Sequence, residues 1–298
     1  MKKSKFNIQL VLLHLAALLF GGTAVFSKIL PIPSNDIILS RSGLSCFFLG
    51  LFFFFHRSKL KISRKDYFSV LFSGLFFGIH LFTYFYAIHI SSIGIGVISL
   101  FTFPLMTTLL EPFVLKLKPK KKDLMLGFLI LVGVFLIVSD TDLKGRSFEG
   151  VVFGIVSAIS YSIRNLIQKY RLSDYRPDSM LFYQMLITFI IMLPFSTTDF
   201  TQMSLVNYEL LIVLSVVFTI IPHLAVIESL KMFDARSVSL ILTLQVFYAI
   251  IIAYFVINED FKLSVVVGGS LVFFTVSYES LRIQYQLKKK PTFLMILS

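Results

Sequence analysis

The chain has 298 residues, of which 56% are hydrophobic and only 15% are charged. Soluble domains usually carry about 25% charged residues, so this composition excludes an ordinary soluble protein. The single cysteine, Cys46, lies within an apolar stretch, which excludes a disulfide framework and a cysteine metal cluster. The net charge of +12 would suit nucleic-acid binding, but its distribution along the chain indicates another role.

Ten apolar segments follow one another, each about long enough to cross a bilayer as a helix, at roughly 20 residues per crossing. The first segment has no small-residue cleavage site and leads directly into further apolar segments, so we interpret it as a membrane helix and not as a cleaved signal. The ten segments are 8–30, 36–56, 67–88, 93–115, 123–139, 148–168, 179–195, 209–230, 237–257 and 264–283.

The connections between these segments carry most of the 28 lysines and arginines. If the N-terminus is placed inside, nearly all of them fall on the inner side, and the outer connections hold only Lys144, Arg146 and Lys262. This asymmetry is the positive-inside rule, and it predicts ten spans with both termini in the cytoplasm. We therefore expect the basic residues to face the headgroups of the lipid bilayer, and we expect no nucleic-acid partner.

The chain also contains an internal repeat. A shift of 141 positions pairs the first segment with the sixth through the fifth with the tenth, and it aligns Tyr67 with Tyr208, Gly127 with Gly268, and Pro104 with Gln245. Because each copy has an odd number of spans, the second copy enters the membrane from the opposite side. We therefore predict an all-α integral membrane fold of ten transmembrane helices in two inverted five-helix repeats, 1–143 and 144–290, with a C-terminal tail at 291–298.

Four stretches, taken in their order, resemble the drug/metabolite transporter superfamily and in particular its EamA-type members. They are ILSRSGLSCFF in the second segment, YFYAIHISSIGIGVISLFTFPLMTTLLEPF across the third and fourth, GFLILVGVFLIV in the fifth, and INEDF after the ninth. The resemblance implies a bacterial inner-membrane transporter of a small organic metabolite, such as an amino acid, a nucleoside-like compound or S-adenosylmethionine. Lys118 and Gln245 depart from the glutamate and proline that the family would carry there, which leaves the substrate open.

Polar residues deep within the segments are the candidate site, because an ionisable group there costs about 2.5 to 3.5 kcal/mol on insertion scales and usually has a partner or a function. His80 and Tyr84 lie one helical turn apart and share a face. The 141 shift brings Glu228 to the same side but places His223 about 200° away. We therefore expect one of the two histidines to face a central cavity, unless Pro222 reorients its helix.

Two other segments and two arginines complete the prediction. Pro104 frees a backbone carbonyl in the fourth segment, where a substrate or ion can bind. Arg164 is expected to grip a substrate carboxylate, to pair with a glutamate or to extend to the interface. Arg41 is expected to extend to the outer interface or anchor its helix there, with substrate contact as the alternative. The predicted substrate residues are His80, Tyr84, Thr108, Arg164, His223, Gln245 and Tyr248, with proton coupling by Glu111 and Glu228 and a helix kink at Pro104.

Motifs for other functions are missing from the sequence. There is no G-x-x-x-x-G-K-[ST] and no H-E-x-x-H, so we expect no nucleotide-driven pump, no metal, no cofactor and no enzyme. The function that we predict is secondary transport by alternating access, driven by protons or by exchange, in a monomer or a homodimer. The alternatives are a non-transporting scaffold or receptor subunit and an integral-membrane enzyme.

Overall fold

A computed structural model describes residues 2–56, 60–116 and 146–258 continuously, and elsewhere only residues 125, 128–129, 132, 263, 266–268, 270–271, 274–275 and 278. The continuous parts form helices joined by short connections. The α-helices are α1 (Lys2–Ile29), α2 (Ser34–His56), α3 (Tyr67–Ile90), α4 (Ile93–Leu100), α5 (Phe103–Leu115), α7 (Arg146–Tyr170), α8 (Pro177–Met192), α9 (Leu205–Ser215), α10 (Ile221–Met232), α11 (Ala235–Leu242) and α12 (Leu244–Ile257). Short helical turns lie at η1 (Arg64–Asp66), η2 (Leu193–Phe195), η3 (Phe200–Gln202) and η4 (Val216–Ile220).

Eight stretches of the described chain are helical, long and apolar enough to cross a membrane. Each corresponds to one of the predicted segments, which confirms an all-α, multi-pass membrane protein. The predicted segments 123–139 and 264–283 lie largely outside the described residues. The eight spans are Ile8–Ile29, Ser34–His56, Arg64–Ile90, Ile93–Leu115, Arg146–Tyr170, Pro177–Phe195, Leu205–Met232 and Ala235–Ile257.

The bundle has an apolar exterior, and it buries polar side chains among its hydrophobic core. Phe54, Phe113 and Phe255 expose 78%, 81% and 76% of their surface, and in water faces of this kind drive association. In hydrocarbon such faces are favourable, whereas unpaired polar groups there are costly. The interior accordingly buries the polar side chains, including Arg41 and Arg164, which are 1% and 0% exposed.

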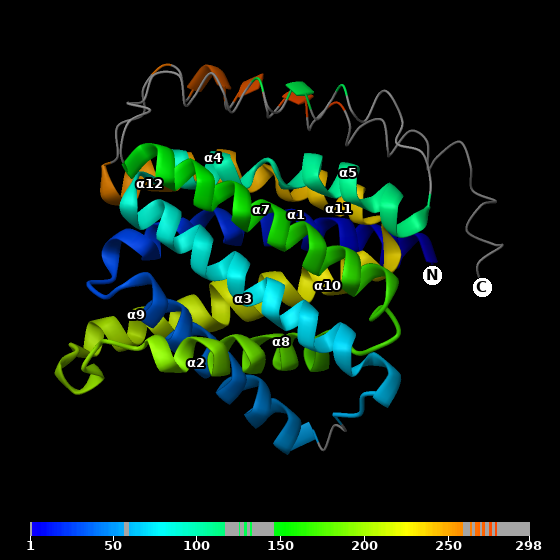
Figure 1. Ribbon diagram of the computed structural model, residues 1–298, viewed down its shortest axis with the longest axis horizontal. Coiled ribbons are helices and arrows are strands. Elements are labelled where there is room, and N and C mark those ends of the chain that lie inside the picture. The colour runs from blue at the N-terminus through cyan, green and yellow to red at the C-terminus, as the bar shows by residue number, and fades with distance from the viewer. Residues whose placement is uncertain are drawn as a thin grey trace.

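The helices pack side by side, and α3 crosses obliquely between α7 and α8 (Figure 1). Helix α1 packs against α12 and α10. Gly21 allows α1 and α12 to come close together, because a Cβ at this position would lie only 2.6 Å from the Cβ of Tyr248. Small residues of this kind let membrane helices come close together.

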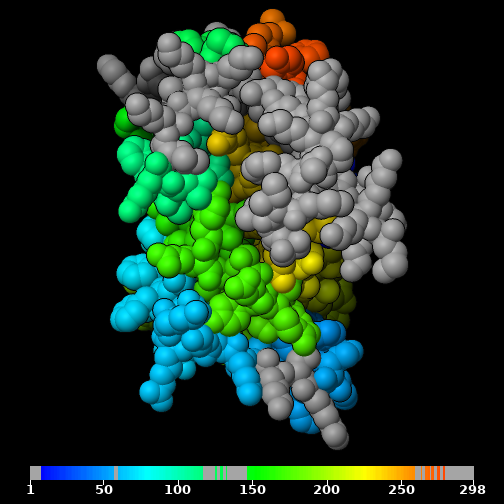
Figure 2. Space-filling model, turned by 90° about the vertical axis from the view of Figure 1, so that its right-hand side faces the viewer, coloured from blue at the N-terminus to red at the C-terminus, as the bar shows by residue number. Residues whose placement is uncertain are grey.

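The two ends of the bundle differ in charge. Figure 2 looks onto the end where α2 is followed by α3, α7 by α8, and α10 by α11. This end carries Arg64, Lys65, Arg171, Arg176 and Arg236. The connections at the opposite end, 30–33, 91–92 and 193–204, contain no lysine or arginine. The basic residues of these described connections therefore gather at one end, as the sequence predicts.

The spans Ile93–Leu115 and Ala235–Ile257 are each interrupted by a tight turn at equivalent points, called breaks below. Thr102 separates α4 from α5, and Thr243 separates α11 from α12, 141 positions further on. The Thr102 hydroxyl donates to the Ser99 carbonyl at 3.0 Å, and the Thr243 hydroxyl donates to the Leu240 carbonyl in the same way. The backbone N–H of Thr102 and of Thr243 donates to the same carbonyl, at 3.3 and 3.2 Å. Each turn therefore keeps its backbone hydrogen bonding, shifted to three residues back, which keeps the irregular helix tolerable inside a membrane.

Candidate functional site

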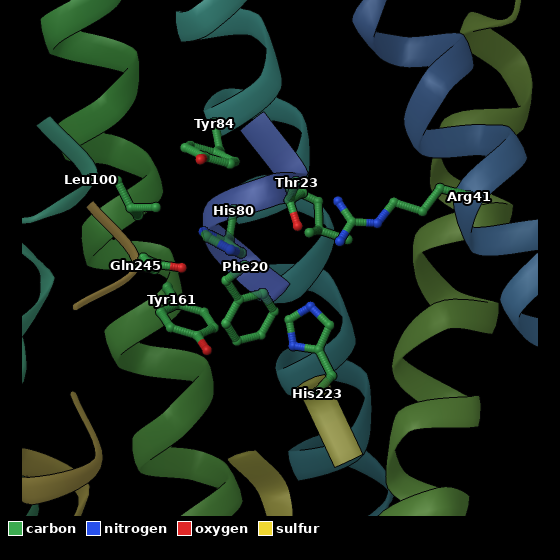
Figure 3. A pocket seen from close by; sticks show the side chains of 10 residues that line it. Phe20, Thr23, Arg41, His80, Tyr84, Leu100, Tyr161, His223 and Gln245 are labelled. Carbon is green, nitrogen blue, oxygen red and sulfur yellow. The ribbon is translucent and has the colours of Figure 1, made fainter. Parts of the chain in front are cut away.

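A small hollow lies in the middle of the bundle, between α1, α2, α3, α4, α7, α10 and α12 (Figure 3). Its volume is about 20 Å³, room for about one water molecule. Each lining side chain is at most 8% exposed. The lining residues are Phe20, Thr23, Arg41, His80, Leu81, Tyr84, Leu100, Tyr161, His223 and Gln245.

His80 enters the hollow from α3 and is held by Ser157 of α7. The His80 Nδ1 lies 2.8 Å from the Ser157 hydroxyl oxygen, and that hydroxyl lies 3.0 Å from the His80 carbonyl. A serine hydroxyl has one proton, so both contacts are satisfied together only if Ser157 donates to the carbonyl and Nδ1–H donates to Ser157. This assignment makes Nε2 the acceptor of a neutral His80. The ring also stacks on Tyr161 with centroids 4.4 Å apart.

His223 lies across the hollow on α10 and has a different environment. It is 1% exposed, and neither ring nitrogen has a hydrogen-bond partner. The rings of Phe20 and Phe77 pack against it, each with a centroid distance of 4.7 Å. Buried polar atoms are nearly always paired, so an unpaired imidazole facing a hollow suggests a site for something that binds there.

Both histidines line the hollow, so the helix that carries His223 is reoriented relative to the 141-residue shift. The reason is the π-helical turn η4, which precedes α10. Its wider spacing is visible in the backbone N–H of Ile221, which donates five residues back to the Val216 carbonyl. A π turn adds one residue and rotates the rest of the helix by about 100°. The rotated His223 then corresponds to Leu81, another lining residue.

Arg41 reaches from α2 towards Thr23 and the hollow (Figure 3). Its Nε donates to the Thr219 hydroxyl at 2.5 Å, and its Nη2 contacts the Phe218 carbonyl at 3.4 Å. That carbonyl has no donor at position 222, because Pro222 lacks an N–H. Arg41 Nη1 has no partner. The expectation that Arg41 anchors its helix at the interface is therefore wrong.

Arg164 is buried outside the lining of the hollow. Its Nε and Nη2 donate to the Gln184 side-chain oxygen at 3.1 and 2.5 Å, and its Nη1 donates to the Asn165 side-chain oxygen at 2.8 Å. The guanidinium also lies over the Phe77 ring, 4.7 Å from its centroid. All three nitrogens thus have acceptors, and the pairing with a glutamate that the sequence suggested is not formed.

The other predicted residues take separate positions. Thr108 is buried, and Tyr248 packs against Gly21, but neither lines the hollow. Pro104 lies in the first turn of α5, directly after the break. Leu100, whose carbonyl would pair with position 104 in an unbroken helix, does line the hollow.

The two predicted coupling glutamates both lie away from the hollow. Glu111 is 2% exposed and accepts from Arg236 Nη2 at 3.1 Å and from the Tyr170 hydroxyl at 2.7 Å. Glu228 is half-exposed and lies 3.6 Å from Lys231, one turn along the same helix. Only the Glu111 contacts join different spans of the bundle.

At the opposite end of the bundle, Asp36 makes a comparable set of contacts. Its carboxylate accepts from the backbone N–H and the hydroxyl of Thr197 and of Thr198, at distances between 2.6 and 3.3 Å. These bonds tie the start of α2 to the segment after η2. The Glu111 contacts and the Asp36 contacts therefore close the bundle above and below the hollow.

Six lining residues were not predicted as site residues, namely Phe20, Thr23, Arg41, Leu81, Leu100 and Tyr161. Arg41 is the one with a usable sequence signal, since a charge within an apolar segment usually faces the interior. Within the described parts of the chain, no three His, Cys, Asp or Glu side chains gather as a metal-binding group.

An apolar exterior, two spans broken at matching positions and a polar hollow between them define a multi-pass α-helical membrane protein with an interior site. The model of the EamA-like transporter family matches the chain twice, at residues 7–139 and 148–278. The chain belongs to this family and is a membrane transporter.

Two relatives carry transporter names, and one solved structure shares the fold. The "S-adenosylmethionine uptake transporter" of Rickettsia conorii (strain ATCC VR-613 / Malish 7) is 27% identical over 209 residues, which cover 69% of this chain and 68% of that protein. The "Uncharacterized transporter YxxF" of Bacillus subtilis (strain 168) is 23% identical over 261 residues, covering 84% and 81%. A crystal structure described only as that of a protein has a similar fold, with a TM-score of 0.70, 12% identity and coverage of 90% and 96%.

Proposed function

We propose that this chain is a secondary active transporter of small organic metabolites that works by alternating access. The observation that carries the proposal is the buried hollow with polar and aromatic lining, which lies beside the turns between α4 and α5 and between α11 and α12. Interrupted helices at corresponding positions of two halves are typical of substrate sites in such transporters, because they present free backbone groups near the membrane midplane.

Two inverted five-helix repeats, 1–143 and 144–290, followed by the tail 291–298, are the architecture that we propose. Helices α4 and α11 begin in the same way, with the Ser92 side chain accepting from the Ile95 N–H and the Asp234 side chain accepting from the Ser237 N–H. Both spans then break at threonines in equivalent positions, Thr102 and Thr243. The two matches of the family model also fall on either side of the proposed boundary at 143.

Movement between the halves would open one end of the hollow at a time. The Glu111 contacts with Arg236 and Tyr170 join the first half to the second at the basic end of the bundle. The Asp36 contacts with Thr197 and Thr198 join the halves at the other end. With both sets formed, the hollow is too small for a metabolite, so a substrate would enter only after one set has broken.

The substrate, on this proposal, is an amino acid, a nucleoside-like compound or an S-adenosylmethionine-like compound. The name of the rickettsial relative supports the last of these. The chain would lie in the inner membrane of a bacterium with its basic end and both termini in the cytoplasm, as the positive-inside rule indicates. Glu111, buried between the halves, is our candidate for proton coupling; exchange of two metabolites is the alternative driving force.

Uptake into lipid vesicles tests this proposal. The purified full-length protein would be reconstituted, and vesicles preloaded with one unlabelled metabolite would be diluted into the same labelled metabolite, across a panel of amino acids, nucleosides and S-adenosylmethionine. A transporter accumulates at least one labelled compound beyond protein-free vesicles. A scaffold, a receptor subunit or an enzyme would accumulate none.

A further inference from the structure

Arg41 lacks a counter-charge. Its neighbours Thr219 and Phe218 offer only neutral oxygens, and Nη1 has no acceptor. The three ion pairs found in the described part of the chain use Arg176, Lys231 and Arg236. A guanidinium is effectively always charged. The Phe85 ring, whose centroid lies 5.3 Å from the Arg41 Cζ, offsets only part of the cost of burying that charge without a counter-charge.

The hollow itself offers no compensation. Among its ten lining residues Arg41 carries the only fixed formal charge, and none of them is a carboxylate. The two carboxylates that lie above and below it, Glu111 and Asp36, are held by their own partners. Since no described residue supplies a counter-charge to Arg41, we expect it to come with whatever enters the hollow.

The shape of the site suits one kind of anion. A guanidinium presents its N–H groups in a planar fork that matches a carboxylate. Nη1 is free, and Nη2 makes only the 3.4 Å contact with Phe218, so both can turn to a carboxylate. The rest of the lining is neutral: aromatic rings for an apolar or planar group, and the Gln245 amide for a further polar group.

We infer that the hollow takes a carboxylate-bearing metabolite and that Arg41 is the residue that binds its carboxylate. This inference rests on the proposed transport function and narrows it. It favours substrates such as α-amino acids and S-adenosylmethionine over nucleosides, which have no carboxylate. Arg41 then sets specificity, whereas His223 and Gln245 contact the remainder of the molecule.

The test compares matched pairs of compounds on the purified full-length protein. Thermal stabilisation would be measured with the standard L-amino acids, S-adenosylmethionine and the common nucleosides, and with the methyl ester of each acid that stabilises. We expect the stabilising compounds to be acids, and their esters to bind about 30-fold more weakly or worse, as for loss of one partner of a buried charge pair. This comparison needs no variant.

Three variants then test whether Arg41 is the residue that binds the carboxylate. Arg41→Met should lose the response to the stabilising acid, Arg41→Lys should keep a weaker response, and Arg64→Met, at an exposed arginine in η1, should respond as the natural protein does. An ester that binds as well as its acid, stabilisation by a nucleoside, an unchanged response in Arg41→Met, or no stabilising acid at all would overturn the inference.

Vesicle uptake separates this inference from the proposed function. If a panel compound is transported but neither esterification nor Arg41→Met weakens its uptake, the carboxylate assignment is wrong and the transport function stands. If no panel compound is transported, the transport function itself fails.

Discussion

Arg41 and Arg164 are both fully buried, but their surroundings differ in one respect. Every nitrogen of Arg164 has a side-chain oxygen to donate to. Arg41 has one nitrogen without an acceptor, and it faces the hollow. Burial alone therefore does not identify a functional charge inside a membrane; the informative property is whether its hydrogen bonds are complete. A complete set indicates a structural residue, and an incomplete set indicates a binding residue.

The largest expected effect comes from removing the arginine with the complete set. Arg164→Met keeps much of the side-chain volume but leaves the Gln184 and Asn165 oxygens without their donor. We expect the free energy of unfolding to fall by about 3 kcal/mol, because several buried hydrogen bonds to a charged group are lost at once. Unfolding by heat or by SDS in mixed micelles would measure the change.

Arg41→Met is the matched control for that experiment. Its partners keep other bonds: the Thr219 hydroxyl still donates to the Leu214 carbonyl, and the Phe218 carbonyl still faces the Thr23 hydroxyl at 3.4 Å. The substitution also removes an uncompensated charge, so we expect a loss below about 1 kcal/mol, or a gain. Equal losses in the two variants would show that the contrast between the arginines is not real.

The two histidines give a smaller version of the same contrast. Ser157→Ala removes the acceptor of His80 Nδ1 and the donor to the His80 carbonyl. We expect a loss of about 1 kcal/mol, the usual size of an interhelical hydrogen bond in a membrane. His223→Leu removes an imidazole with no partner, so the same unfolding assay should show a smaller loss. A larger loss for His223→Leu would mean that its nitrogens are paired after all.

The glutamates extend the comparison from stability to transport. Glu111→Gln weakens the contact between the halves, and we expect the transport rate to change by about tenfold, since about 1.4 kcal/mol in the balance of two states is a factor of ten. Glu228→Gln removes only a half-exposed pair with Lys231, and such pairs are worth little. Transport rates measured in vesicles that carry each variant check this. If the rates of Glu111→Gln and Glu228→Gln differ by less than a factor of two, the role of Glu111 is contradicted.

Much of the fold could be predicted from the sequence. Apolar length and the placement of lysine and arginine identified the eight described spans, because hydrocarbon thickness and the positive-inside rule act on every span separately. The predicted kink at Pro104 lies directly after the break between α4 and α5, whereas no kink was predicted at the matching break between α11 and α12. These signals are local, so a single sequence is enough to read them.

The candidate site was predictable only in part, because it depends on which face of each helix turns inward. His80, Tyr84, His223 and Gln245 line the hollow, whereas Thr108, Tyr248 and Arg164 do not. The π turn at η4 rotates His223 inward, and no residue pattern in the sequence predicts that turn. The sequence places Arg41 near the interface because it lies only about one turn from the end of its segment. Its partners Thr219 and Phe218, which draw it into the bundle, lie on a distant part of the chain.

The most direct test of alternating access measures from which side the hollow can be reached. In a Cys46→Ser background, which removes the only natural cysteine, Leu100→Cys would place a single thiol in the hollow. A membrane-impermeant maleimide would then be applied to each side, with Arg236→Gln to weaken the contacts at the basic end or Asp36→Asn to weaken those at the opposite end. We predict that Arg236→Gln raises labelling from the basic side and lowers it from the other, and that Asp36→Asn does the reverse. Labelling from both sides at once in either variant, or from neither side in both variants, would contradict the account.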